Sequence, residues 1–209
     1  MPADLASPDL VGDAERRRTA ADLGIWLFLA TEVLFFGGLV TSYVIGRTLH
    51  PAPFIVAARE TDLTYGTLNT AILLTSSLLI ALAVKLGRAQ ARQTRWLVLA
   101  TVLLGAAFLA VKALEYYGDI LEGLVPGPAF PLQPPAAQMF WALYWLMTGV
   151  HALHVIAGMA VLSVILALDS AARLDANSPA LETAALYWHL VDVIWIFLYP
   201  MLYLVGRSA

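Results

Sequence analysis

The segment LETAALYWHLVDVIWIFLYPMLYLV, residues 181–205, is the most informative part of the sequence. It has the length of a helix that crosses a membrane, which needs about 20 mainly apolar residues. It nevertheless contains His189 and Asp192, two side chains that are costly in hydrocarbon and that lie on one side of a helix. We therefore expect this side of the helix to face protein, either the other spans of the chain or another subunit.

The composition of the whole chain is that of a membrane protein. Of its 209 residues, 60% are hydrophobic and only 13% are charged, and the mean hydropathy is +0.77. A soluble domain of this size does not need so much apolar sequence. The absence of cysteine excludes disulfides, iron–sulfur clusters, c-type haem attachment and thiolate copper sites. No basic patch with interleaved aromatic residues is present, which argues against a nucleic-acid partner.

Five apolar segments predict an all-α, polytopic membrane helix bundle with five transmembrane helices. The first 22 residues are polar and lack an apolar region followed by a cleavage site, so we interpret residues 1–22 as a cytoplasmic N-terminal tail and not as a signal peptide. The rest, residues 23–209, is predicted to be one transmembrane domain. Its predicted helices are residues 23–45, 65–84, 96–114, 139–168 and 184–205.

The orientation follows from the loops and their positive charges. The one long connection, residues 115–138, contains five prolines and three glycines and predicts an irregular surface loop. With the N-terminus inside, the inner segments carry eight Lys and Arg residues and the outer segments four, with Lys112 counted among the outer ones. This bias predicts a cytoplasmic N-terminus and a periplasmic C-terminus, with the loop on the outer side.

The histidines raise the question of metal or haem binding. His151 and His154 in the fourth span share the i, i+3 spacing of His189 and Asp192. A bis-histidine haem needs two imidazoles at one depth, whereas counting about 1.5 Å per residue separates His154 from His189 by roughly 13 Å. The Glu-x-x-His motif of di-iron sites is also absent. We predict no metal site, and neutral histidines hydrogen-bonded between helices.

Glu32 is an isolated carboxyl group in the first span. Hydrocarbon disfavours the charged form of such a group. Two interpretations stay open: a proton relay, or a neutral side chain that only hydrogen-bonds a neighbour. By helical rise, Glu32 and Asp192 both lie roughly 12–13 Å from the inner surface. Our hypothesis is that these two buried carboxyl groups form one acidic level, close to the inner side, against a partner subunit or a lipid.

A basic cluster lies between the second and third spans. Such a cluster is first of all the signal that keeps a loop on the inner side of the membrane. It also predicts contacts with anionic lipid head groups. Its members are Lys85, Arg88, Arg92 and Arg95.

Five blocks of sequence, taken in order and spacing, resemble subunit III of the haem–copper oxidases. They cover nearly the whole chain, and the combination of TGVHALHVIAG with YWHLVDVIWIFLY is the most specific feature. The blocks are WLFLATEVLFFGGLVTSYV (26–44), LNTAILLTSSLLIALA (68–83), KALEYYGDI (112–120), FWALYWLMTGVHALHVIAGM (140–159) and ETAALYWHLVDVIWIFLYPMLYLV (182–205).

The resemblance implies a helical subunit of a bacterial inner-membrane oxidase that packs against subunit I, with subunit II as a further partner. It implies no haem or copper on this chain, since these cofactors belong to the partner subunits. It also implies phospholipid binding, support of proton uptake and protection of the catalytic subunit during turnover. The family's buried carboxylate matches Glu32, and its other polar motif residues match Glu115, His151, His154, His189 and Asp192.

The chain departs from the seven-helix form of this family. It begins at what resembles the third helix, and the two helices before it form one wall of the family's lipid cleft, so another subunit would have to supply that wall. A five-helix form occurs in quinol oxidases and in an accessory protein of nitric oxide reductase. The electron donor, the terminal acceptor and the complex stoichiometry stay open. The alternatives are a nitric oxide reductase accessory subunit and a stand-alone transporter or proton channel.

Overall fold

The computed structural model describes residues 8–86, 91–128, 130–132, 135–170 and 179–207, and no strand occurs in these ranges. Five of its helices contain spans long and apolar enough to cross a membrane. This confirms the predicted all-α, five-helix membrane fold. The elements are α1 (Pro8–Leu49), α2 (Pro51–Arg59), α3 (Leu63–Leu86), α4 (Ala91–Leu121), α5 (Ala136–Ser170), α6 (Pro179–Tyr199) and the π-helical turn η1 (Pro200–Leu204).

The chain divides into two compact units, Met1–Gly38 and Leu39–Ala209, and each is described by itself. The first unit holds most of α1, which is helical from Pro8 onward. The polar segment at the N-terminus is therefore helical over most of its length, and Glu32 lies further along the same helix. The second unit contains the end of α1 and all the other elements.

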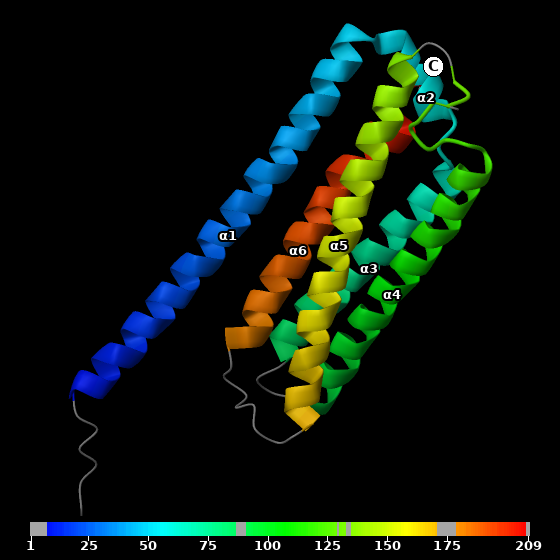
Figure 1. The fold of residues 1–209 in the computed structure, drawn as a ribbon. Helices are drawn as coiled ribbons and strands as arrows, with labels where there is room; N and C mark the ends of the chain where they lie inside the picture. The colour runs from blue at the N-terminus through cyan, green and yellow to red at the C-terminus, as the bar shows by residue number, and fades with distance from the viewer. Residues whose placement is uncertain (1–7, 87–90, 129, 133–134, 171–178, 208–209) are drawn as a thin grey trace, which may run out of the picture. The chain divides into compact units, whose positions relative to one another are not determined.

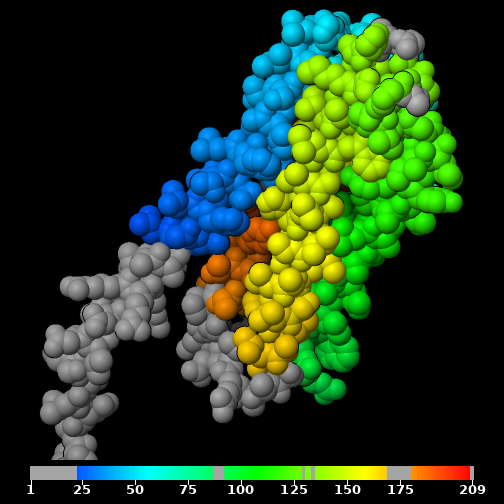
Figure 2. Space-filling model, viewed as in Figure 1, coloured from blue at the N-terminus to red at the C-terminus, as the bar shows by residue number. Residues whose placement is uncertain are grey.

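Within the second unit, α3, α4, α5 and α6 form a four-helix bundle. Each of these helices packs against the next, and α6 packs against α3, so the ring of contacts closes. Successive helices run in opposite directions (Figure 1). The short helix α2 packs against α5 and η1 at one end of the bundle. In the space-filling view, the side chains of α4 (green) and α5 (yellow) form a continuous surface along the bundle (Figure 2).

Local chemistry fixes where the helices begin and end. The Asp62 carboxylate accepts hydrogen bonds from the N–H groups of Thr64 (2.7 Å) and Tyr65 (3.3 Å), so it satisfies free donors at the start of α3. Gly123 ends α4 with a φ of 76°, a left-handed conformation that favours glycine. Its N–H donates back to the Ile120 carbonyl at 3.1 Å, as is typical of helix C-termini.

The prediction of an irregular loop over residues 115–138 is wrong at both ends. Helix α4 continues to Leu121, and α5 already begins at Ala136. The apolar pattern of the third span stops at residue 114 because charged side chains follow it. These side chains face the bundle interior, as described below, so the helix continues although the apolar sequence does not.

The C-terminal end of α6 is shaped by Pro200. Proline has no N–H to donate, and its ring clashes with the carbonyl of the preceding turn, so an α-helix cannot continue through it undisturbed. The chain instead forms the π-helical turn η1. This turn buries both Leu202 and Tyr203. The Tyr43 hydroxyl donates to the carbonyl of Met201, which attaches the turn to the end of α1.

Two arginine side chains connect the turn after η1 to the end of α2. Arg207 donates from Nη2 to the carbonyl of Arg59 at 2.8 Å and also to the carbonyl of Thr61. Arg59 in turn donates from Nε to the carbonyl of Gly206 at 3.0 Å. These bonds satisfy carbonyl groups at the end of α2, where a helix leaves its last acceptors free. The turn after α6 and the end of α2 are thereby joined.

Small residues let the large aromatic side chains of α6 enter the core. A Cβ atom added at Gly158 of α5 would lie 2.8 Å from the Trp188 ring, and one added at Gly105 of α4 would lie 2.9 Å from it. Trp188 is fully buried, and its Nε1 donates to the Ser76 hydroxyl of α3 at 3.1 Å. One indole ring therefore contacts three neighbouring helices, which is possible only where their backbones leave room.

We predict that the same substitution destabilises the bundle at one glycine of α5 and has little effect at another. Gly158→Ala should destabilise the bundle by about 1–3 kcal/mol, because the buried Trp188 ring has no space into which to move. Gly149→Ala is the control, since the nearest atom to its added Cβ is the Tyr116 hydroxyl at an ordinary 3.8 Å. The measurement is the thermal unfolding midpoint in detergent. Equal midpoints for both variants would contradict the packing described here.

Candidate functional site

A cluster of charged side chains lies inside the bundle. Lys112, Glu115 and Asp119 occupy positions i, i+3 and i+7 of α4, a spacing that places them on one face of the helix. Their exposed fractions are only 2%, 2% and 6%. Charged residues are almost never buried to this extent unless they are paired, so these three side chains require partners in the neighbouring helices.

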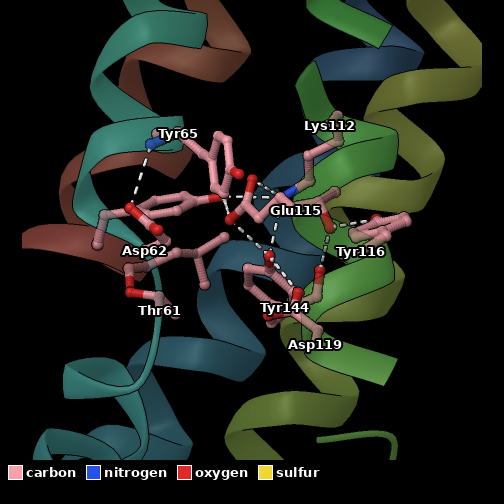
Figure 3. Close-up of polar contacts among 12 residues, drawn as sticks. Thr61, Asp62, Tyr65, Lys112, Glu115, Tyr116, Asp119 and Tyr144 are labelled. Atoms are coloured by element: carbon pink, nitrogen blue, oxygen red, sulfur yellow. Dashed lines mark hydrogen bonds and ion pairs between the residues drawn. The ribbon is translucent and has the colours of Figure 1, made fainter. Parts of the chain in front are cut away.

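Two tyrosines supply these partners. The Lys112 ammonium donates to Glu115 Oε2 (3.0 Å), to the Tyr144 hydroxyl of α5 (2.9 Å) and to the Tyr203 hydroxyl of η1 (2.7 Å). Both hydroxyls donate to Glu115 Oε1, Tyr144 at 2.8 Å and Tyr203 at 2.7 Å. The Tyr144 hydroxyl also lies 3.0 Å from Asp119 Oδ2. Figure 3 shows Lys112, Glu115 and Asp119 turned from α4 toward Tyr144. We call these five residues the charged cluster.

Aromatic rings surround the ammonium group of the charged cluster. Lys112 Nζ lies 4.5 Å from the centre of the Tyr144 ring, 4.9 Å from that of Tyr116, 5.5 Å from that of Tyr203 and 5.8 Å from that of Trp195. A cation at these distances is attracted by the electron-rich ring faces. The rings replace water around the charge, and the three hydrogen bonds of the ammonium satisfy all of its donors.

The charged cluster joins three elements that are far apart in the sequence. Its hydrogen bonds run between α4, α5 and η1, and 91 residues separate Lys112 from Tyr203. A buried ion pair contributes little net stability, but removing one partner leaves an uncompensated charge in the core. The arrangement therefore favours the one packing in which every member is paired. It contains carboxyl, ammonium and phenol groups, which can hold protons and make hydrogen bonds.

Sequence reasoning found only one member of the charged cluster, Glu115. The assignment of Lys112 to the outer loops was wrong, because this side chain is buried in the bundle. Without Lys112, the inner segments still carry more Lys and Arg residues than the outer segments, so the predicted orientation is unchanged. Asp119, Tyr144 and Tyr203 were not singled out. The available signal was the spacing of opposite charges along one face of α4, which indicates a paired interior and not a loop.

The three predicted histidine positions differ in their surroundings. His189 Nδ1 lies 2.8 Å from the Ser77 hydroxyl of α3, an interhelical hydrogen bond of the predicted kind. His154 Nδ1 contacts the carbonyl of Val150 in its own helix at 2.8 Å. His151 is fully buried, and within the described residues neither of its ring nitrogens has a hydrogen-bond partner. The prediction of interhelical hydrogen bonds is thus wrong for His151.

The predicted depth difference between His154 and His189 is also wrong. The Tyr187 hydroxyl donates to the carbonyl of His154 at 3.2 Å, and the Trp188 ring contacts Gly158, one turn along α5. These contacts place the two histidines at similar depths. The count failed because it started from the ends of the apolar segments, whereas α5 is longer than its apolar segment. Among the described residues, no group of three His, Cys, Asp or Glu side chains is placed to hold a metal ion.

The predicted carboxyl groups belong to different parts of the chain. Asp192 is buried in the second unit with an exposed fraction of 3%. Glu32 lies in the first unit, so their common level stays a prediction. Of the basic cluster, Lys85 at the end of α3 and Arg92 and Arg95 at the start of α4 are exposed, as head-group contacts require. Arg88 lies outside the described residues.

Comparison with known proteins identifies similar chains. A family model described as cytochrome c oxidase subunit III matches residues 12–207. Cytochrome c oxidase subunit 3 of Corynebacterium diphtheriae is 30% identical, over 97% of this chain and 96% of that protein. Cytochrome bo(3) ubiquinol oxidase subunit 3 of Pseudomonas aeruginosa is 31% identical, over 88% and 84%. A protein named heme-copper oxidase subunit I+III, from Aeropyrum pernix, is 31% identical over 87% of this chain and 22% of its own length.

We predict that the charged cluster is far more sensitive to losing one partner than to losing the ion pair as a whole. Lys112→Met should destabilise the chain by roughly 3–5 kcal/mol, because it leaves the Glu115 carboxylate buried without a counter-charge. Lys112→Met combined with Glu115→Gln should recover part of this loss. Lys85→Met, at an exposed position, is the control. Thermal unfolding measures the effect, and a double variant no more stable than Lys112→Met would argue against paired burial.

Proposed function

The chain belongs to the cytochrome c oxidase subunit III family, as a subunit III of a haem–copper terminal oxidase, and we propose that it is a non-catalytic subunit that braces subunit I, binds phospholipid and supports proton uptake. As a multi-pass membrane protein, it would work in a bacterial inner membrane. Haem and copper would be held by the partner subunits. The relatives are named as subunits of cytochrome c oxidases and of quinol oxidases alike, so this proposal is independent of the electron donor.

The observation that carries the bracing role is the relative named heme-copper oxidase subunit I+III. Its name joins subunit I and subunit III in one chain, and such a fusion requires the two parts to occupy one complex. The build of this chain agrees with a permanent partner in the membrane. The side chains of its charged cluster are paired inside the bundle, whereas the outward positions of α3 to α6 carry large apolar residues such as Leu78, Leu103, Leu153 and Phe197. Such a surface can pack against apolar helices or lipid.

Phospholipid binding is supported by the exposed cationic side chains at the α3 and α4 ends. Lys85, Arg92 and Arg95 approach one end of the bundle from both of these helices. Cationic groups next to a membrane span attract anionic head groups, with about 1 kcal/mol for each charge near the surface. In the proposed orientation this end faces the cytoplasm.

The test of this proposal is purification of the tagged chain from its native membrane in mild detergent. We expect a coloured complex with haem absorption bands, a subunit I and a subunit II, together with phospholipid measured in the same eluate. The copper ligands of subunit II, or their absence, would identify the electron donor. A colourless chain that survives gentle extraction alone, and that carries proton flux in liposomes, would overturn the subunit role in favour of a channel.

Support of proton uptake makes a separate prediction for two carboxyl groups, Asp192, which is buried, and Glu32, which is half-buried. Glu32→Gln combined with Asp192→Asn should slow oxidase turnover or hasten its inactivation during turnover, because both changes remove a group that can release a proton while keeping its shape. Glu182→Gln makes the same chemical change at an exposed position of α6 and should have no effect. Activity traces of the purified complexes provide the measurement. Unchanged assembly, turnover and inactivation in the double variant would refute the acidic-level hypothesis.

A further inference from the structure

Three buried polar side chains in the bundle have no hydrogen-bond partner among the described residues. They are Asn69 of α3, His151 of α5 and Asp192 of α6, with exposed fractions of 0%, 0% and 3%. Every side-chain nitrogen and oxygen of these three residues is unpaired. The Nε1 atom of Trp141 is also unpaired, but its ring lies 4.8 Å from that of Tyr144, beside the charged cluster.

The three unpaired side chains come from positions in the chain that are connected to one residue, Trp195. The His151 ring lies 5.0 Å from the Trp195 ring. The Trp195 Nε1 atom donates to the hydroxyl of Thr70, the residue after Asn69, at 3.1 Å. Asp192 precedes Trp195 by three residues on the same face of α6, which corresponds to a rise of about 4.5 Å. His151 therefore contacts the Trp195 ring, Asp192 lies about one helical turn before Trp195 on α6, and Asn69 is adjacent in sequence to the residue that Trp195 hydrogen-bonds.

Contacts on both sides fix the position of Asp192 between α6 and α3. Trp188, one turn before it, donates to Ser76, and Trp195, one turn after it, donates to Thr70. The Ser77 hydroxyl lies close enough to interact with the Asp192 carboxyl, and it also hydrogen-bonds His189 Nδ1 at 2.8 Å. Neither carboxyl oxygen has a partner at ordinary hydrogen-bond geometry among the described residues, so the carboxyl group keeps acceptor capacity for another donor.

Leaving these groups dry would be costly. An unpaired buried donor or acceptor costs roughly 1–3 kcal/mol, and native structures contain few of them. Here one imidazole, one carboxamide and one carboxyl group, from three different helices, would be unpaired in the core. In proteins such groups are satisfied by ordered water, which makes two to four hydrogen bonds where polar groups converge.

We propose that Asn69, His151 and Asp192 enclose an internal water-binding site, in which at least one water molecule bridges α3, α5 and α6. Water suits this set of groups because they present both donors and acceptors. A neutral imidazole has one of each, the carboxamide has both, and the carboxyl oxygens accept. A bound metal ion is less suited, since only two of the three side chains are metal-ligating types and no group of three such residues occurs in the described part of the chain.

The water site is distinct from the charged cluster. Trp195 contacts both, since its ring lies 5.8 Å from Lys112 Nζ and 5.0 Å from the His151 ring. The Phe108 ring packs edge-to-face on Trp195 at 4.9 Å and against His151 at 5.5 Å. In the charged cluster, protein groups satisfy one another directly. In the water site, solvent molecules take the place of protein partners.

The first test is an experimental density map of the intact oxidase complex, at a resolution that shows ordered water molecules. We expect at least one water within about 2.7–3.2 Å of two of the three side chains. Infrared spectra of the same complex provide a second observation. The carbonyl band of the Asp192 side chain is identified by its loss in Asp192→Asn. We expect this band to shift when the complex is transferred to D2O, and to shift again in the Asn69→Leu variant. A map in which the three side chains bond one another or stay dry, or a band that does not shift, would overturn the proposal.

The second test measures coupling between the groups. Asn69→Leu and Asp192→Leu should each lower the unfolding midpoint of the complex, and the double variant should lower it by less than the sum of the two single shifts, since both groups share one water. Asp192→Asn is the matched control that keeps hydrogen-bonding capacity and should lower the midpoint least. Additive shifts would contradict a shared water. If the variants fail to assemble, the map and the D2O shift of the natural complex still decide the question.

Discussion

The second unit of this chain depends on one buried cation. The Lys112 side chain is buried in the bundle, and its ammonium is satisfied only when Glu115, Tyr144 and Tyr203 are all in place. This requirement fixes the position of α4 relative to α5, and the position of the π-helical turn η1 relative to both helices. Apolar packing alone tolerates shifts of one helix along another, whereas a buried charge that loses a partner costs several kcal/mol. The charged cluster thus selects one register for three elements.

Apart from Asn69, His151 and Asp192, the rest of the bundle follows the same principle of polar pairing inside and apolar surface outside. Helices in lipid gain little from burying apolar side chains, because the lipid is equally apolar. Close packing and interhelical hydrogen bonds must hold them together. Trp188 combines both, since its ring fills the space left by two glycines and its Nε1 donates to Ser76. Trp195 makes a similar interhelical hydrogen bond, since its Nε1 donates to the Thr70 hydroxyl. It lies one level closer to the charged cluster than Trp188 does.

This architecture suits the proposed role of a non-catalytic subunit. The chain belongs to the cytochrome c oxidase subunit III family, and interhelical hydrogen bonds connect the helices of its polar interior. The charged cluster and the proposed water site lie at neighbouring levels of one core. They give the bundle a fixed shape that a catalytic subunit can pack against. The carboxyl groups within the membrane are the features that connect this scaffold to the proposed support of proton uptake.

The five spans, the helical class and the family all follow from the amino-acid sequence. A bilayer demands about 20 apolar residues per span, and the motifs around His151 and His189 are specific. The tertiary structure alone decided which polar groups meet. Lys112 looked like a loop charge because it follows an apolar run, and its pairing with Tyr203 depends on the π-helical turn at Pro200. His151 looked like a hydrogen-bonded histidine, yet packing leaves its nitrogens without protein partners. Spacing along one helix shows which side chains share a face, but the register between helices determines what that face touches.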